Sequence, residues 1–176
     1  MAELLGRARE VGLVRTLLGS SRLVTITGAP GIGKSSVARA ATGAMSGVRR
    51  FEGLRALRRA LRDADPKERI ELFVVDDLEP RTPEVRTLVQ ALLRRGRVLV
   101  TGSAPLDLRA EGVVRLRGLG VEAAVKLLAS RGGGDLLATP DTAPYAALAD
   151  ALDRNPAALE RMAERIGHVD GALLVE

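Results

Sequence analysis

The sequence contains no cysteine and very few aromatic residues. Its 176 residues include two Phe, one Tyr, no Trp and a single His. Without cysteine, neither a disulfide framework nor a thiolate metal site can form. The scarcity of aromatic rings leaves few platforms on which the bases of single-stranded nucleic acid could stack. These absences exclude the disulfide-stapled class of small proteins and disfavour single-strand binding.

Long apolar runs and targeting segments are also missing. No stretch approaches the roughly 18 consecutive apolar residues that a bilayer-spanning helix needs. The first ten residues, MAELLGRARE, lack the basic-then-apolar order of a signal peptide. A content of 46% hydrophobic and 28% charged residues is typical of a globular chain. We therefore expect a cytoplasmic globular protein with no membrane partner.

The chain is basic, with a formal net charge of +5. Among its 27 basic residues only Lys34, Lys67 and Lys126 are lysines, and the rest are arginines. Arginine can indicate a nucleic-acid partner, because the guanidinium group matches phosphate geometry. Alternatively, the arginines are spread over solvated helix faces, and charge alone locates no binding face. We favour the second interpretation, so nucleic-acid binding is the least favoured function.

Hydrophobic patterning predicts strands that alternate with helices over the first two thirds of the chain. Short apolar segments predict strands at residues 23–27, 48–51, 72–75, 97–101 and 113–116. Between them, helical periodicity predicts helices at residues 8–18, 34–44, 54–61 and 85–93. Strands that alternate with helices and are apolar on both faces are typical of a parallel α/β sheet. After residue 118 the pattern predicts only helices, at residues 121–130, 145–152 and 156–166.

Residues 28–35, GAPGIGKS, match the phosphate-binding motif G-x-x-x-x-G-K-[ST] in full. An expected strand precedes the motif and an expected helix follows it, as this motif requires. Its glycines let backbone N–H groups turn toward phosphates, and the helix N-terminus adds about half a positive charge. Lys34 then reaches the β- and γ-phosphates, and the Ser35 hydroxyl ligates Mg²⁺. The alternative is a glycine-rich turn that merely links strand to helix, and the complete motif in its context argues against it.

A P-loop also needs an acidic residue at the tip of a second strand to hold the magnesium ion. LFVVDD, residues 72–77, supplies Asp76 at the carboxyl end of an apolar strand, the edge where α/β sheets bind ligands. Asp77 would orient or activate the attacking water, so we expect Lys34 and Asp77 to be catalytic. The alternative for Asp77 is a capping or loop carboxylate. The nucleotide-binding residues expected at the loop are Gly28, Ala29, Pro30, Gly31, Ile32, Gly33, Lys34, Ser35 and Ser36.

In this order, the motifs resemble the signal-transduction ATPases called STAND, and within them the NB-ARC-like modules of bacterial regulators. LLGRARE, residues 4–10, is similar to the family signature h-h-G-R-E-x-E, with Ala8 in place of the first Glu. The resemblance implies that Leu5, Gly6 and Arg7 contact the adenine side of the nucleotide. A plain amphipathic helix entry explains the leucines but not the Gly-Arg pair.

Two further segments resemble the same family and depart from it. LDRNPAALERMAERI, residues 152–166, is similar to L-D-G-L-P-L-A-L-E, which implies that Pro156 packs on the base; simple helix initiation is compatible with this role. RVLVTGSAPL, residues 97–106, resembles V-L-x-T-S-R-x-P-L, but Ser103 stands where the family has an arginine that senses the γ-phosphate. Serine cannot supply the transition-state charge of an arginine. Arg97 and Arg109 lie nearby in the sequence, which does not decide whether either substitutes.

The resemblance implies an α/β, parallel-sheet P-loop NTPase of the ASCE type with about five strands. Its nucleotide-binding domain covers residues 1–117, and a small helical lid subdomain covers residues 118–176. The implied cofactors are ATP or ADP with Mg²⁺, and the implied partners are effector or sensor proteins and a second copy on ATP binding. Adenine is favoured over guanine only because no N/T-K-x-D motif is found. Two functions stay open: a switch with slow or no ATP hydrolysis, and a catalytically inactive, nucleotide-clasped interaction module.

Overall fold

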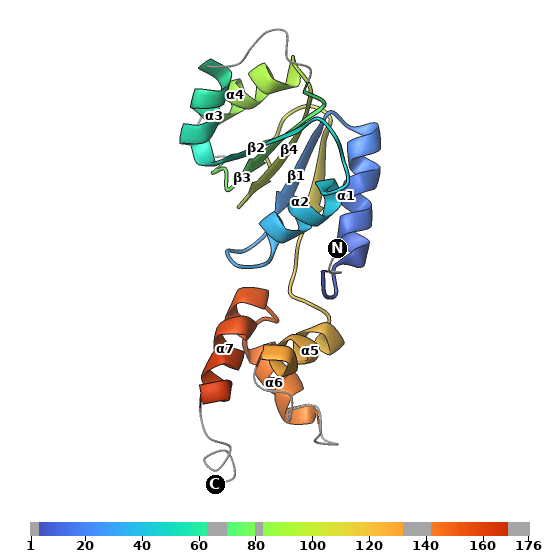
Figure 1. Ribbon diagram of the computed structural model, residues 1–176, viewed down its shortest axis with the longest axis vertical. Helices are drawn as coiled ribbons and strands as arrows, with labels where there is room; N and C mark the ends of the chain where they lie inside the picture. The colour runs from blue at the N-terminus through green and yellow to red at the C-terminus, as the bar shows by residue number, and fades with distance from the viewer. Residues whose placement is uncertain (1–3, 63–69, 80–82, 132–141, 169–176) are drawn as a thin grey trace. The chain divides into compact units, whose positions relative to one another are not determined.

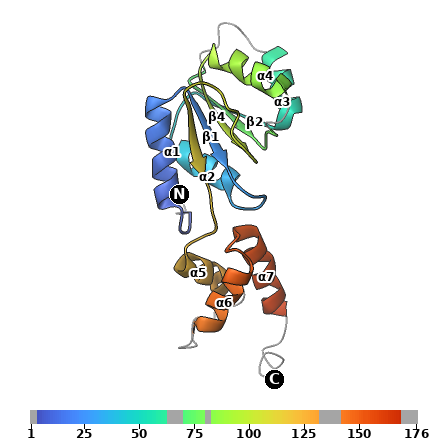
Figure 2. The same cartoon turned by 180° about the vertical axis from the view of Figure 1, so that it is seen from behind.

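The computed structural model describes residues 4–62, 70–79, 83–131 and 142–168. Within these ranges the chain forms two compact units (Figures 1 and 2). One unit consists of residues 8–30 and 34–116 and contains the whole sheet. The other groups residues 4–7 and the loop tip, Gly31–Gly33, with the residues from 117 onward.

In the described part of the chain, five parallel strands form one sheet in the order β2-β3-β4-β1-β5. Their bounds are β1 Leu23–Thr27, β2 Val48–Glu52, β3 Leu72–Asp76, β4 Arg97–Gly102 and β5 Glu111–Arg115. The three central strands are buried along nearly their whole length, which is why they read as apolar runs rather than as alternating patterns. The α/β class and the five parallel strands expected from the sequence are therefore confirmed.

Two pairs of helices flank the sheet (Figures 1 and 2). They are α1 Ala8–Ser20, α2 Lys34–Thr42, α3 Gly53–Arg62 and α4 Pro83–Leu93. α3 and α4 bury their apolar stripes against alternate residues of β3 and β4, including Phe73, Val75, Val98 and Val100, because side chains alternate between the two faces of a strand. α1 and α2 pack against each other and against β1. Helices therefore cover both faces of the sheet and exclude water from its central strands.

The edge strands show where the hydrophobic pattern was a poor guide to boundaries. β5 was expected at residues 113–116, but it begins at Glu111 and ends at Arg115. Its start is set by pairing with β1, which places Glu111 beside Leu23, and not by the hydrophobicity of its own residues. The helix expected at residues 54–61 is observed as α3, and residues 63–69, which follow it, lie outside the described ranges.

The strand order determines which residues meet at the carboxyl edge. β4 lies between β1 and β3, and its Val100 pairs with Val75 of β3. The next residues along, Thr101 and Asp76, therefore also lie side by side. All five strands are parallel, so the loop after β1 and the acidic residues after β3 leave the sheet at the same edge.

In its described residues the second unit contains helices and no strand, as the sequence predicted. α5 Val121–Arg131, α6 Ala143–Ala151 and α7 Pro156–His168 pack around a small apolar cluster. Its buried members are Leu119, Ala124, Leu128, Ala149, Leu159 and Ala163. The domain limits 1–117 and 118–176 and the role of these helices as a lid remain predictions. In the described ranges, no helix combines the length and apolarity that crossing a bilayer demands.

Candidate functional site

The loop between β1 and α2 is the segment in which the sequence predicted a phosphate site. Gly31 and Gly33 have φ angles of +74° and +97°, a backbone conformation that glycine adopts without strain. In the described part of the chain, the N–H groups of Ile32 and Gly33 meet no hydrogen-bond acceptor. Consecutive free N–H groups at such a bend, beside a helix N-terminus, form a concave nest for an anion.

Lys34 is the first residue of α2 and folds back on this loop. Its Nζ donates hydrogen bonds to the carbonyl oxygens of Gly28 and Ala29, at 3.0 and 3.1 Å. Ser35 and Ser36 follow in the first turn of α2, and both are half-buried. The ammonium group is therefore held at the first residues of the loop, Gly28 and Ala29.

Across the edge of the sheet, Asp76 accepts two hydrogen bonds on one oxygen. Ser35 Oγ donates to Asp76 Oδ1 at 2.8 Å, and the Thr101 hydroxyl donates to the same oxygen. Thr101 is 1% exposed, and its Oγ1 also accepts a hydrogen bond from the backbone N–H of Asp77 at 3.0 Å. The structure thus brings Ser35 and Asp76, the two expected metal ligands, into direct contact.

Thr101 is a site residue that sequence reasoning missed. In the sequence it appeared only as the last apolar-strand position of RVLVT. The sequence carried one signal, a hydroxyl residue next to the end of a buried strand and followed by Gly102. In the structure, a Cβ added at Gly102 would lie 2.5 Å from the carbonyl oxygen of Leu78. That close approach brings the segment after β3 against the end of β4, and Leu78 N donates to Thr101 O at 2.8 Å.

Asp77, the residue expected to position water, has an unusual backbone. Its φ angle is +53°, and its side chain is exposed at the edge of the sheet. A non-glycine residue in this region costs on the order of 1–3 kcal/mol, and such residues concentrate at functional sites. The Thr101 hydroxyl holds the N–H of Asp77, which stabilises this conformation.

Ser103 occupies the position where the family resemblance has an arginine, and it has an acidic neighbour. Its Oγ donates to Glu79 Oε2 at 3.2 Å. Neither candidate substitute lies at this edge. Arg97 begins β4, about 17 Å from the end of that strand at roughly 3.3 Å per residue. Arg109 precedes β5 and lies, like Arg97, at the amino edge of the sheet, because β5 begins there: its first residue, Glu111, pairs with the first residue of β1.

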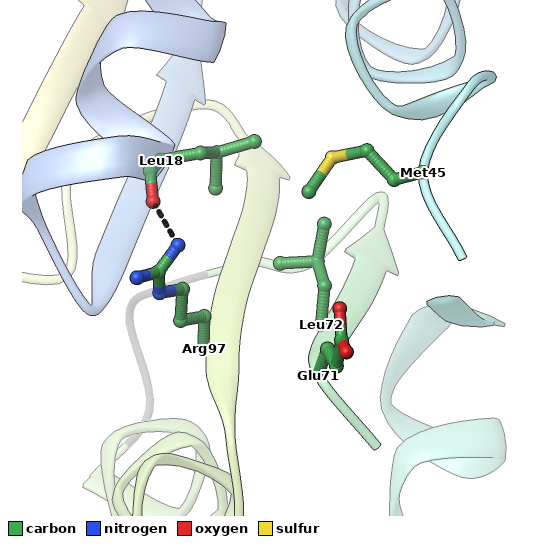
Figure 3. Close-up of a pocket in the computed structure, with 5 residues that line it drawn as sticks. All are labelled: Leu18, Met45, Glu71, Leu72 and Arg97. Carbon is green, nitrogen blue, oxygen red and sulfur yellow. Dashed lines mark hydrogen bonds between the residues drawn. The ribbon is translucent and has the colours of Figure 1, made fainter. Parts of the chain in front are cut away.

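Arg97 contributes instead to a cavity at the amino edge of the sheet (Figure 3). Its Nη1 donates to the carbonyl oxygen of Leu18 at 2.8 Å. The cavity measures about 340 Å³ and is lined by Leu18, Met45, Glu71, Leu72 and Arg97. Because β3 and β4 begin beside it, this cavity lies at the end of the sheet opposite the P-loop.

In the helical unit, Arg7 is buried against backbone carbonyls. It is 3% exposed, and its Nη2 donates to the carbonyl oxygens of Ile32 and Arg117, at 3.0 and 2.7 Å. Leu5, by contrast, is 39% exposed. Gly6 has a φ of +66°, and an added Cβ there would lie 2.5 Å from Ala123 Cβ. The three residues with an implied adenine role therefore differ sharply in environment.

Pro156 is the first residue of α7, at a capped helix start. Asn155 Oδ1 accepts hydrogen bonds from the N–H groups of Ala157 and Ala158, the side-chain capping that asparagine favours. The N–H of Ala157 also donates to the carbonyl oxygen of Gly31 at 3.2 Å. Pro156 lacks an N–H and loses nothing at this position. Helix initiation by Pro156 is thus observed, and its contact with a base stays a prediction.

Comparisons with known proteins support the fold. No protein-family model matches the sequence, and no curated protein matches it. A signal transduction ATPase with numerous domains (STAND) and a tetratricopeptide repeat sensor, from Pyrococcus horikoshii, matches 89% of this chain at a TM-score of 0.60 and 20% identity. A Walker-type ATPase from Pyrococcus abyssi matches 91% at a TM-score of 0.64 and 15% identity. A mutant of RuvB from Thermotoga maritima matches 93% at a TM-score of 0.63 and 14% identity.

The matches cover unequal parts of the compared proteins. This chain spans 29% of the STAND protein, 67% of the Walker-type ATPase and 63% of RuvB. At these identities the likeness concerns the path of the backbone. The chain has the fold of the P-loop ATPases, including a STAND protein, with a small group of helices after the sheet.

Proposed function

We propose that this chain binds ATP and ADP with Mg²⁺ as a switch of the STAND type, with slow or no intrinsic hydrolysis. The observation that carries the proposal is the hydrogen-bonded cluster of Ser35, Asp76 and Thr101 beside the P-loop. A hydroxyl and a carboxylate 2.8 Å apart are hard oxygen ligands, which suit Mg²⁺ when phosphate oxygens and water complete its shell. The residues present therefore fit this ion.

Each residue of the loop has its own task in this proposal. The N–H groups of Ile32 and Gly33 hydrogen-bond phosphate oxygens, and Lys34 compensates the charge of the β- and γ-phosphates. Ser35 and Asp76 hold the metal ion, while the Thr101 hydrogen bond fixes the direction of the carboxylate, as outer-shell partners commonly do. When bound, Mg²⁺ neutralises negative charge on the phosphates.

Slow hydrolysis follows from the residues around the γ-phosphate position. Asp77 would orient a water for in-line attack, but the stabilising arginine is replaced by Ser103, whose neighbour Glu79 is acidic. Removing such an arginine costs about 10³–10⁵ in rate where it has been measured. An arginine donated by a neighbouring copy would restore the charge, so we expect turnover to rise on assembly.

The helical unit is proposed to be the regulatory part. In this proposal α5, α6 and α7 form a lid whose position depends on the bound nucleotide, with Leu5, Gly6 and Pro156 on the base side. A change of nucleotide would then expose a surface for a second copy or for effector or sensor proteins. The sharing of this fold by a STAND protein supports the proposal.

The proposal is tested by calorimetric titration of ADP with Mg²⁺, followed by phosphate release from ATP. Lys34→Ala removes the loop cation, and Lys126→Ala is the matched control, because Lys126 is exposed on α5 and forms an ion pair with Glu122. We expect binding by the wild type and the control, at least tenfold weaker binding by Lys34→Ala, and phosphate release near background. Absence of nucleotide binding by the wild type would contradict the proposal.

The Ser103–Glu79 pair favours a second candidate, a nucleotide-clasped interaction module without catalysis. ADP would then stabilise the fold, and signalling would come from partner contacts alone. Ligand that binds only the folded state stabilises it by about 3 kcal/mol at a hundredfold excess over Kd. Co-purified ADP, together with no phosphate release even at high protein concentration, would favour this module over the switch.

A further inference from the structure

Arg7 is a buried arginine, 3% exposed, whose Nη2 donates to two backbone carbonyl oxygens. Its Nη2 bridges Ile32 O in the P-loop tip and Arg117 O at the start of the helical unit, at 3.0 and 2.7 Å. Charged donors make the stronger class of hydrogen bond, worth roughly twice a neutral one. The guanidinium therefore ties three segments of the same unit together: the chain start, the loop tip and residue 117.

These bonds act on the peptide groups that form the anion nest. The C=O and N–H of a trans peptide point in opposite directions. Holding the carbonyl of Ile32 therefore aims the N–H of Gly33 away from Arg7. In the same way, the bond from Ala157 N to Gly31 O aims the N–H of Ile32 away from α7. In each of these two peptide groups, the carbonyl oxygen accepts a hydrogen bond and the N–H, which has no acceptor, points to the opposite side.

We propose that Arg7 is a positioning residue that holds the P-loop tip in its phosphate-binding form. The inference rests on the proposed nucleotide function and extends it, because it assigns Arg7 to the phosphates through the loop backbone and not to the adenine. Preorganising a binding loop improves affinity by removing the entropic cost of ordering it on binding. Losing Arg7 should therefore weaken the binding of the phosphate part of the ligand alone.

The experiment separates the two halves of the nucleotide. Pyrophosphate with Mg²⁺ probes the loop, and adenosine, followed by ligand-observed NMR, probes the base side. Arg7→Ala removes the clamp and Arg7→Lys keeps a shorter cation. Arg9→Ala, two residues on and exposed in α1, removes the same charge without touching the loop. Thermal melting of each variant, and amide hydrogen exchange at Ile32 and Gly33, report whether the fold and the loop tip remain ordered.

We expect Arg7→Ala to raise the Kd for pyrophosphate roughly tenfold or more, Arg7→Lys to recover part of this, and adenosine binding to change less than twofold. Amide exchange at the loop tip should quicken in both Arg7 variants and stay unchanged in Arg9→Ala. If Arg7→Ala does not fold, the same comparison is made with Arg7→Lys.

Three results would overturn the inference. Loss of adenosine binding with unchanged pyrophosphate binding would assign Arg7 to the base. Equal loss of both ligands, in proportion to a lowered melting temperature, would leave only a structural role. Failure of the wild type to bind either ligand would remove the proposed function itself, a result recognised before any variant is compared.

Discussion

Thr101→Val tests the cluster that organises the carboxyl edge of the sheet. Valine has nearly the shape of threonine, so the change removes a hydroxyl and little volume. Two hydrogen bonds disappear: the one that Thr101 donates to Asp76 Oδ1 and the one that it accepts from Asp77 N. Thr101 is 1% exposed, so water cannot readily replace the lost hydroxyl.

The expected cost follows from these two bonds. A hydrogen bond to a charged group contributes about 1.5–3 kcal/mol, and a buried N–H left without an acceptor costs about 1–3 kcal/mol. Asp76 retains the bond from Ser35 and is half-buried, and the N–H of Asp77 is only partly buried, so the lower ends of both ranges apply. We expect Thr101→Val to lower the free energy of unfolding by about 2–3 kcal/mol, a large part of the 5–15 kcal/mol typical of a domain.

Thr25→Val is a matched control with the opposite expected sign. Thr25 lies in β1, is fully buried, and its Oγ1 has no hydrogen-bond partner in the described part of the chain. Burying an unpaired hydroxyl costs about 1–3 kcal/mol in proteins, so valine at this position should be neutral or stabilising. Chemical denaturation of both variants at one pH and salt concentration measures the difference.

The reasoning about Thr101 would be refuted by either of two results. If Thr101→Val is as stable as the wild type, the hydroxyl does not organise Asp76 and Asp77. If Thr25→Val is destabilised as much as Thr101→Val, both losses reflect a general cost of threonine replacement in the sheet. In that case the hydrogen bonds at the edge carry no special stability.

Two further predictions concern the loop tip and the outer helices. Gly31→Ala should destabilise the protein by about 2–3 kcal/mol, because the φ angle of Gly31 is +74° and the new Cβ would lie 2.7 Å from Ala157 Cβ. Gly12→Ala lies in the exposed middle of α1 with nothing within 4 Å of the new Cβ, so it should stabilise the protein by about 0.5–1 kcal/mol. Denaturant titration measures both changes in the free energy of unfolding, and equal effects of the two variants would contradict the prediction. The hydrogen bonds from Arg58 lower the pKa of Glu84 below its ordinary value of 4.5. The stability that the Arg58–Glu84 pair contributes is therefore present above pH 4.5 and is lost as the pH falls through the lowered pKa. Glu84→Gln should flatten this part of the plot of melting temperature against pH. An unchanged plot would show that the pair contributes nothing.

Short-range features of the site could be predicted from sequence because they are local. The P-loop motif places its glycines, Lys34 and Ser35 within eight residues, and the apolar run before Asp76 defines a strand whose end must lie at the carboxyl edge. The α/β class follows from the alternation of patterns, and the structure confirms it. The functional roles of these residues remain predictions.

What could not be predicted depends on contacts between distant segments. Thr101 becomes a partner of Asp76 only because β4 lies between β1 and β3, and no short pattern encodes strand order. Arg7 matched a signature that implies an adenine contact, yet its Nη2 donates to Ile32 O and Arg117 O, the latter 110 residues away. The start of β5 likewise depends on its register with β1.

The most direct test of the central claim is a calorimetric titration of ADP into the wild-type protein with and without Mg²⁺. If the loop amides and Lys34 bind the diphosphate while Ser35 and Asp76 hold the ion, ADP will bind in both conditions and more tightly with Mg²⁺. No heat of binding with Mg²⁺ present, at protein concentrations where the fold is intact, would contradict the account.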